Sequence, residues 1–236
     1  MGQFVRLEVE GGVGVVRIDR PPANAIDLET AEALLAAVDT ASRSSAAVIV
    51  GRDRFFSAGV DLRAVPTYTP DQQLRMVALI DQLIGRLYAC ERPLVGAVNG
   101  HALGGGLIVA LCCDWRVGTD DPAARFGLPE VRVGIPFPPM PMAVVRSELS
   151  RSAARRLALR GAPIGASEAL ALGVLDEVVP SDRVLDRALE VARELGSLPP
   201  EAFRRTKREL RGRAADGDGW LVDDVAGAEA AALRPR

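Results

Sequence analysis

The chain has 236 residues, of which 48% are hydrophobic, 25% are charged and only 4% are aromatic. This length and composition indicate one globular domain, or one domain with a small appendage, with a core built mainly from alanine, valine and leucine. The formal net charge of −2 argues against a basic field for nucleic acid, and no apolar stretch approaches the ~20 residues of a membrane span.

The three cysteines, Cys90, Cys112 and Cys113, are odd in number and set in apolar surroundings. This usage predicts buried, reduced thiols and not a disulfide framework. The adjacent pair Cys112-Cys113 lacks the Cys-x-x-Cys spacing of metal sites, so no metal is expected. The N-terminal segment lacks the basic stretch and apolar run of a secretory signal, so we expect a cytoplasmic protein.

The N-terminal half alternates predicted strands and helices, as in α/β proteins with a largely buried sheet. The Gly11-Gly12 pair between two apolar runs predicts a hairpin, and Asp27 is a suitable N-cap for the helix that follows. In chain order, we expect strands at 4–9 and 13–18, a helix at 28–41, a strand at 46–50, a helix at 71–90, a strand at 93–98, a helix opening at Gly104 and a strand at 115–118.

The C-terminal half has a mostly helical pattern. Beyond 137 we expect a helix at 167–172, extended chain at 174–179, a helix capped by Ser181 that runs to 195, and a helix at 199–210. The last segment, 212–236, is rich in alanine, aspartate and glycine, and the alternatives for it are a helix at 220–233 or partial disorder.

Three consecutive glycines, Gly104 to Gly106, lead from an apolar strand directly into an apolar helix. Glycine lets a ligand approach the backbone closely, and the first N–H groups of a helix have no partner inside it. Such a turn suits a phosphate or an oxyanion. A second small-residue turn, Ser57 to Val60, follows another strand-like run and would supply a converging N–H donor. The alternative is a pair of tight turns that only permit close packing.

Three motifs strengthen the ligand interpretation when they are taken together. They are Phe-Ser-Ala-Gly-Val-Asp-Leu at 56–62, Asn-Gly-x-Ala-x-Gly-Gly-Gly at 99–106 and Phe-Gly-Leu-Pro-Glu-x-x-x-Gly at 126–134. In order and spacing the chain resembles the enoyl-CoA hydratase/isomerase (crotonase) family, over roughly residues 4–210. The resemblance implies an α/β crotonase (ClpP-like) fold, which is a spiral of ββα units with a helical C-terminal part. It also implies a core domain at 1–180, a trimerisation region at 181–236, and a homotrimer or homohexamer.

The resemblance further implies a site for an acyl-CoA thioester. The family holds the thioester oxygen between two backbone N–H groups, which by motif position belong to Val60 and Gly105. Glu130 stands where family members use a carboxylate base. Other positions implied to border the substrate and its coenzyme A are Ala58, Asp61, Leu62, Arg63, Gly104 and Ile108. Beyond the coenzyme A that the substrate carries, no cofactor is implied.

Two of these side chains have a physical argument of their own. The apolar neighbours of Glu130, which are Leu128, Val131 and Val133, are expected to exclude water and to raise the pKa of its carboxyl group. Arg63 is a candidate for contact with a phosphate. Without the motif, Glu130 would be interpreted as a solvated surface glutamate.

Ile108 departs from the hydratase pattern, which has a second glutamate at this position. Hydration needs one group to activate water and another to deliver a proton, and isoleucine can do neither. Moving a double bond from the 3,4 to the 2,3 position needs one base only, so the sequence favours an enoyl-CoA Δ3-Δ2 isomerase. The alternatives are an enoyl-CoA hydratase of the fatty-acid β-oxidation type, in which Glu130 works with another group, and a homologue that binds acyl-CoA without catalysis.

A second departure is the proline-rich segment 135–142, where many relatives have glycine and threonine. In one interpretation Phe137, Met140 and Met142 form an apolar wall for the acyl chain. In the other, the segment is a rigid connector that packs against the core.

The remaining polar candidates carry weaker signals. His101, the only histidine, lies inside the glycine motif and is expected to be a turn or core-edge residue. Asp114 ends an apolar helix and is expected to be structural. The basic run 204–208 is expected to be a solvated helix face, and the resemblance offers contact with the adenine end of coenzyme A as the alternative.

Overall fold

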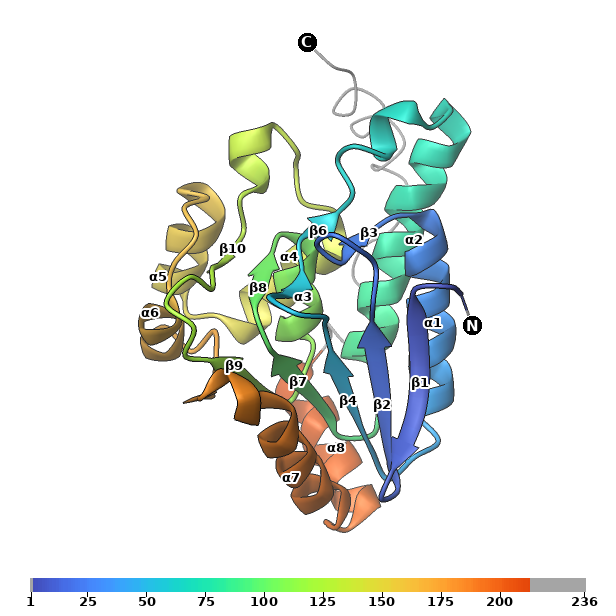
Figure 1. The fold of residues 1–236 in the computed structure, drawn as a ribbon, viewed down its shortest axis with the longest axis vertical. Helices are drawn as coiled ribbons and strands as arrows, with labels where there is room; N and C mark the ends of the chain where they lie inside the picture. The colour runs from blue at the N-terminus through green and yellow to red at the C-terminus, as the bar shows by residue number, and fades with distance from the viewer. Residues whose placement is uncertain (1, 213–236) are drawn as a thin grey trace.

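The computed structural model describes residues 2–212 as a mixed α/β fold built on a six-stranded sheet (Figure 1). The strand order is β1-β2-β4-β7-β9-β11; β1 runs antiparallel to β2, and the other neighbours are parallel. The strands are β1 (Val5–Glu10), β2 (Val13–Ile18), β4 (Ala46–Val50), β7 (Leu94–Val98), β9 (Trp115–Thr119) and β11 (Glu177–Val179). The predicted α/β class is therefore confirmed.

The main sheet follows from local sequence features. The β1–β2 hairpin turns at Gly11 and Gly12, whose φ angles of 57° and 84° lie in the left-handed region that glycine adopts without strain. β4 and β7 lie inside the sheet and are buried at every position, which explains their unbroken apolar runs.

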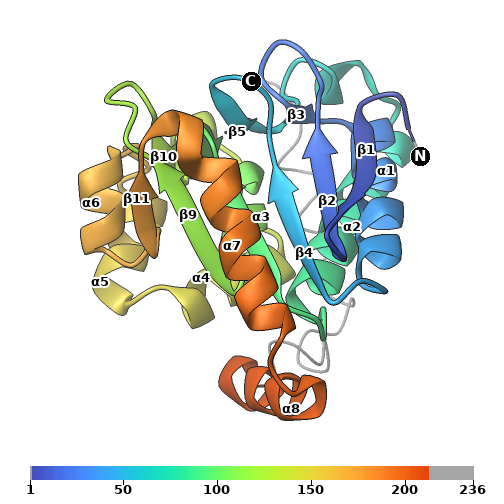
Figure 2. The same ribbon diagram turned by 60° about the horizontal axis from the view of Figure 1, so that its bottom comes forward.

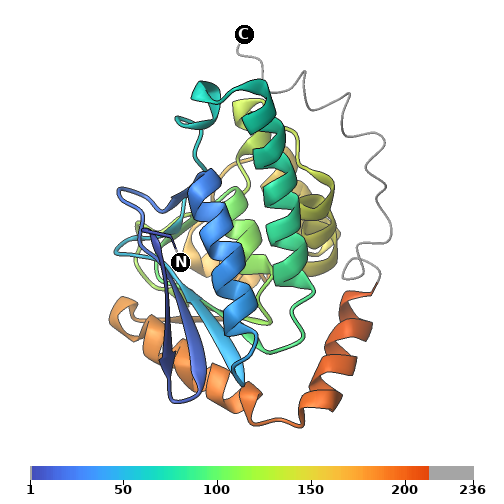
Figure 3. The ribbon, with the colours of Figure 1, turned by 90° about the vertical axis from the view of Figure 1, so that its right-hand side faces the viewer.

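Helices cover both faces of the sheet (Figures 2 and 3). α1 (Leu28–Ala41) packs on β1 and β2 with α2 (Pro70–Tyr88) beside it, and α7 (Val184–Gly196) lies over β4 and β7. Alternate residues of β4 divide between the two cores: Ala47 and Ile49 face the α1 side, and Val48 and Val50 face the α7 side. Since successive side chains of a strand point to opposite faces, α1 and α7 cover opposite sides.

Two smaller sheets lie beyond the carboxyl ends of the main strands, and the sequence analysis did not predict them. The first contains the parallel strands β5 (Phe55–Ser57), β8 (His101–Leu103) and β10 (Phe126–Gly127), and the second pairs β3 (Ala25–Ile26) with β6 (Gly59–Val60). Each strand has only two or three residues, which is too short for a period-2 pattern. The successions β4-β5, β7-β8 and β9-β10, each followed by a helix, form the ββα spiral that the resemblance implied.

The remaining helices are α3 (Gly105–Leu111), α4 (Pro139–Glu148), α5 (Arg151–Ala154), α6 (Ala166–Ala171) and α8 (Pro200–Arg211), with a π-helical turn, η3 (Arg155–Leu159), and 3-10 turns at η1 (Val65–Thr67), η2 (Glu130–Val133) and η4 (Ser181–Arg183). The helix expected from Ser181 begins at Val184, after the η4 turn. Within residues 2–212, no helix is both long and apolar enough to cross a membrane. The alternatives stated for 220–233 concern residues outside the described part of the chain.

The prolines of the 135–142 segment begin α4. Pro138 is the N-cap residue and Pro139 is the first helical residue, where a missing N–H costs nothing. Pro141 also lies in the first turn, so its lack of a donor breaks no bond inside the helix.

Candidate active site

Two glycine-containing turns meet at the amino end of α3. Gly59 has φ +82°, and a Cβ on it would lie 2.6 Å from the carbonyl oxygen of Leu103 and 2.9 Å from the backbone nitrogen of Gly105. A Cβ on Gly106 would lie 2.3 Å from the carbonyl oxygen of Ser57. Only glycine fits at these two positions, so the two turns are held in backbone-to-backbone contact.

Val60 and Gly105 are neighbours across this contact. Val60 ends β6 and Gly105 begins α3, and a Cβ on Gly105 would lie 3.7 Å from the backbone nitrogen of Val60. The structure thus brings together the two residues whose N–H groups the sequence analysis selected. Close approach of two backbone segments is what a pair of N–H donors to one oxyanion requires.

Glu130, the first residue of η2, reaches the same place from a third segment. A Cβ on Gly104 would lie 3.0 Å from its Oε1 atom. Its Oε2 atom is buried and has no hydrogen-bond partner among the described residues. Burial raises the pKa of Glu130 to about 7, and a hydrogen bond from its own backbone N–H opposes the rise only in part. A carboxyl group with this pKa is suited to take and return protons at neutral pH.

The family model for enoyl-CoA hydratase/isomerase matches residues 8–218. The chain belongs to this family. It is 37% identical over 206 residues to the 2,3-dehydroadipyl-CoA hydratase of Escherichia coli K12, covering 84% of this chain and 77% of the relative. It is 33% identical over 218 residues to the mitochondrial enoyl-CoA delta isomerase 1 of Mus musculus, covering 90% and 75%.

A solved structure has the same fold. The human mitochondrial delta3-delta2-enoyl-CoA isomerase superposes with a TM-score of 0.88 at 28% identity, over 98% of this chain and 90% of that one. The crotonase fold that the sequence implied is therefore confirmed. Relatives of this chain carry both hydratase and isomerase names, so membership establishes the enzyme family and is consistent with an acyl-CoA substrate.

Asp61, which follows Val60 directly, uses its carboxylate inside the protein. Its Oδ2 atom accepts a hydrogen bond from Arg20 at 2.8 Å, and Oδ1 accepts from the backbone N–H groups of Arg63 and Ala64 at 3.0 and 3.1 Å. Burial acts to raise the pKa of Asp61, but the hydrogen bonds from Arg20 and the two amides outweigh it and hold the pKa below its ordinary value. These contacts favour a role in shaping the loop.

The other residues expected near coenzyme A differ in exposure. Ala58 is half-buried, whereas Leu62 and Arg63 are exposed. Among the described residues, the guanidinium of Arg63 has no ion-pair partner. Arg63 is therefore available to an external phosphate, and this role stays a prediction.

Ile108 lies in the second turn of α3, where its N–H donates to the carbonyl oxygen of Gly104 at 3.1 Å. Its side chain is 2% exposed and belongs to the main core. The position that holds a second glutamate in hydratases is therefore apolar and packed.

The water-excluding neighbours expected around Glu130 are only partly in place. Leu128 is fully buried, but Val131 and Val133 are 50% and 52% exposed. The expectation for these two valines is wrong, because the η2 turn directs them outward. The glycine turn at Gly104 lies against the Glu130 carboxyl group, whose Oε2 atom is buried.

The two acyl-pocket candidates lie at the start of α4. Phe137 packs against the main core, and Met140 is buried with its N–H donating to Oδ1 of Asp81 at 2.9 Å. Asp81 comes from α2 and caps α4 in place of Pro138, whose side chain cannot. Burial raises the pKa of Asp81. Sequence reasoning missed this cap because donor and acceptor are 59 residues apart.

His101 and Asp114 have the structural contacts expected of them. The His101 ring lies 4.8 Å from that of Phe55, and its Nδ1 accepts the backbone N–H of Arg125 at 3.1 Å. The carboxylate of Asp114 accepts from Lys207 at 2.7 Å and from Arg211 at 2.8 Å.

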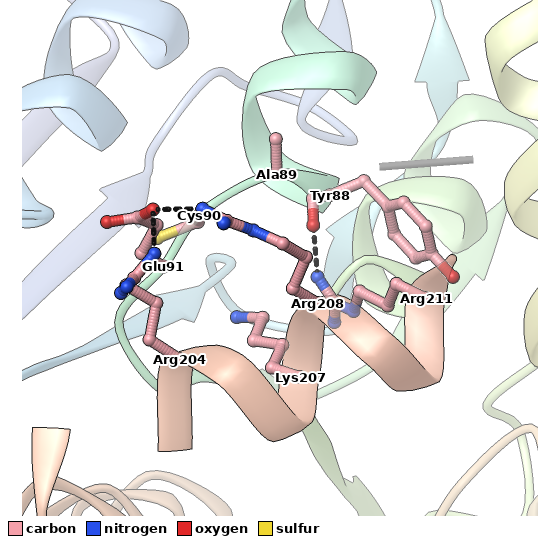
Figure 4. A pocket seen from close by; sticks show the side chains of 8 residues that line it. All are labelled: Tyr88, Ala89, Cys90, Glu91, Arg204, Lys207, Arg208 and Arg211. Carbon is pink, nitrogen blue, oxygen red and sulfur yellow. Dashed lines mark hydrogen bonds and ion pairs between the residues drawn. The ribbon is translucent and has the colours of Figure 1, made fainter. Parts of the chain in front are cut away.

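The basic run on α8 is therefore only partly solvated. Arg204, Lys207 and Arg208 of the run line a hollow of about 210 Å³ against the end of α2 (Figure 4). Lys207 is buried, and Arg211, three residues past the run's end, is buried with its guanidinium donating to the carbonyl oxygens of Tyr88 and Cys112. Arg204 and Arg208 share the exposed carboxylate of Glu91. The expected solvated face is thus wrong for Lys207, because Asp114 provides a buried anion.

Proposed function

We propose that this protein is an enoyl-CoA Δ3-Δ2 isomerase that uses one carboxylate. The observation that carries the proposal is the Glu130 carboxyl group, with its pKa raised to about 7, beside the glycine turn, together with the buried apolar side chain of Ile108. A single base next to two backbone donors is sufficient for a double-bond shift and is insufficient for the usual addition of water.

In the proposed mechanism, the N–H groups of Val60 and Gly105 donate to the thioester oxygen of a 3-enoyl-CoA. The Glu130 carboxylate removes a proton from C2, and the electron pair of the C–H bond moves into a dienolate whose negative charge lies on that oxygen. The protonated Glu130 then returns the proton to C4, and the double bond is left between C2 and C3. No atom is gained or lost. Donors preorganised at an oxyanion are worth about 3–4 kcal/mol each.

The remaining parts of the site are assigned in the same proposal. Phe137 and Met140 form the apolar wall for the acyl chain, and the exposed Arg63 meets a phosphate of coenzyme A. Ala58, Asp61, Leu62, Gly104 and Ile108 border the thioester end. In the same proposal, residues 181–236 provide the subunit contacts of a homotrimer or homohexamer, and a cytoplasmic location stays a prediction.

A hydratase is the second candidate, because the chain is 37% identical in sequence to an Escherichia coli hydratase. In that case a water molecule or a carboxylate from elsewhere would have to do the work of the missing glutamate. The third candidate is a homologue that binds acyl-CoA without turnover, which the packed Ile108 side chain supports.

The test compares a 3-enoyl-CoA and a 2-enoyl-CoA of equal chain length with the wild-type protein and with Glu130→Gln. We expect double-bond migration to be faster than hydration, and we expect Glu130→Gln to lose at least ~10²-fold in kcat. Faster hydration would assign the hydratase. Tight binding of acyl-CoA, with turnover that Glu130→Gln leaves unchanged, would assign the non-catalytic homologue.

A further inference from the structure

The segment that runs from Arg20 to Asp27 lies against the loop that carries Val60. Its strand β3 is the only strand that pairs with β6 in the described part of the chain. The N–H of Ala58 donates to the carbonyl oxygen of Ala23 at 3.0 Å, and the N–H of Asp61 donates to that of Ile26 at 2.9 Å. These bonds hold the chain on both sides of Val60, so the position of the Val60 N–H depends on this segment.

The guanidinium of Arg20 ties the two strands together. Its Nη1 atom donates to Oδ2 of Asp61 at 2.8 Å and to the carbonyl oxygen of Ala25 at 3.1 Å. Its Nη2 atom lies 2.8 Å from Oδ2 of Asp27, which is the N-cap of α1. The side chain of Arg20 is only 17% exposed, and those of its two carboxylate partners are 14% and 16% exposed. One planar group thus links the base of α1 to the residue directly after Val60.

Asn24 adds a second connection to the same loop. It is 2% exposed and has φ +51°, in the left-handed region that asparagine tolerates better than most residues. Its Oδ1 accepts the backbone N–H of Arg20 at 2.9 Å, and its Nδ2 donates to the carbonyl oxygen of Phe55 at 2.9 Å. Its own carbonyl oxygen accepts from Ser57 Oγ at 2.7 Å, and that hydroxyl in turn accepts the N–H of Gly59 at 3.1 Å.

We infer that Arg20 is a positioning residue for the reaction: through Asp61 and Ala25 it fixes the N–H of Val60 relative to that of Gly105. The inference rests on the proposed function, in which both N–H groups polarise the thioester. Without Arg20, the carboxylates of Asp27 and Asp61 lose the cation that they share and repel each other. The loop between them then moves, and a displacement of about 1 Å at a reacting group is enough to lower a rate ~10²-fold.

The test measures polarisation directly, with a ligand that cannot react. Hexanoyl-CoA labelled with ¹³C at the thioester carbonyl is bound to each protein, and the C=O stretching frequency is recorded by isotope-edited infrared spectroscopy. A carbonyl that accepts two strong hydrogen bonds stretches at a lower frequency than in water. The variants are Arg20→Gln, which removes the charge, and Arg20→Lys, which keeps the charge but loses the planar group that reaches both carboxylates. The matched control is Arg17→Gln, since Arg17 pairs with the exposed Glu8 at 3.0 Å.

We expect the wild type and Arg17→Gln to show the same downward shift. Arg20→Gln should lose most of the shift, and its kcat for the double-bond shift should fall at least ~10-fold, while KM changes less. Arg20→Lys should lie between the two. A loss of structural stability alone would lower the melting temperature without changing the frequency of the bound carbonyl.

The outcomes separate this inference from the function on which it rests. If the wild type shows no shift, the oxyanion site and with it the proposed function are rejected. If the wild type shows the shift and Arg20→Gln keeps both the shift and kcat, the positioning role is rejected and the proposed function stands. If Arg20→Gln does not fold, Asp61→Asn weakens the same link from the other end. Retention of the shift and of kcat in Asp61→Asn rejects the positioning role equally.

Discussion

Glu130 and Gly104 are so close that a Cβ on residue 104 would lie 3.0 Å from Oε1 of the glutamate. The proposed base and the glycine turn therefore form one unit, although they are 26 positions apart in the sequence. Any side chain at residue 104 would displace the carboxyl group, and the φ of +52° at Gly104 makes such a side chain costly in any case.

The activity should depend on the ionisation of Glu130. We expect kcat/KM for the double-bond shift to rise as pH increases through about 7, because only the carboxylate can remove the C2 proton. Stability should change in the opposite direction. The unfolded chain releases this proton near the ordinary value of 4.5 and the folded protein holds it up to about 7, so the free energy of unfolding decreases over this interval. In Glu130→Gln, this part of the decrease in melting temperature with pH should disappear. A pH-independent rate between about pH 5 and 8 would contradict the assignment.

Gly105 offers a test of one backbone donor with a matched control. Gly105→Pro removes the N–H at the first position of α3, where proline is tolerated. We expect kcat to fall ~10²–10³-fold, the usual effect of losing one oxyanion donor. Gly105→Ala keeps the N–H, and its Cβ would meet ordinary contacts of 3.7–3.8 Å. The alanine variant should therefore lose much less activity in the same steady-state assay. Equal losses in the two variants would show that the size of residue 105, and not its N–H group, controls kcat.

The identity of residue 108 should control the choice between isomerisation and hydration. Ile108→Glu introduces a second carboxyl group in the turn after Gly105, and we expect hydration of a 2-enoyl-CoA to increase. Ile108→Gln has a similar shape without an ionisable group and should show no such gain. Both variants bury a polar group in the main core and should lose about 1–3 kcal/mol of stability. Hydration rates and urea unfolding would be measured for both, and an equal gain in the glutamine variant would exclude acid–base chemistry at this position.

Asp114 should be much more important for stability than Glu91. Asp114→Ala leaves the buried cations of Lys207 and Arg211 without their anion, and we expect a loss of about 3–5 kcal/mol in urea unfolding. Glu91→Ala removes an exposed carboxylate that pairs with Arg204 and Arg208, and the loss should be below about 1 kcal/mol. Limited proteolysis should detect earlier cleavage near α8 in Asp114→Ala only. Similar losses in the two variants would show that the buried pairs do not anchor α8.

The parts of the fold that the sequence predicted have strong local signals. Asp27 caps α1 as expected, by accepting the N–H of Thr30 at 2.9 Å, and the strand at 46–50 was predicted with its exact bounds. α2 begins at Pro70, one residue before the predicted start, because Thr69 before it and Gln72 after it form a capping box. Signals of this kind lie within four residues of the feature that they predict.

The parts that were missed depend on contacts between distant residues. β3, β5, β6, β8 and β10 are defined by their pairing partners and not by a pattern of their own. The ion pair between Arg20 and Asp61 spans 41 positions, and the cap that Asp81 provides to α4 spans 59. For the candidate site, motif resemblance selected Val60, Gly105 and Glu130, which the structure brings together. It gave no indication that Val131 and Val133 would face outward.

The burial of the cysteines has a practical consequence. Burial raises the pKa of Cys113 to about 12 and that of Cys112 well above its usual range, and Cys90 is 8% exposed where α8 meets the end of α2. An alkylating reagent can therefore attack Cys112 and Cys113 only when the chain opens, whereas Cys90 borders the hollow between α8 and the end of α2. Faster labelling at Cys90 reports the departure of α8, and labelling at Cys112 and Cys113 reports exposure of the core at the end of α3. The alkylation rates of the native cysteines thus report two levels of opening, with no engineered probe.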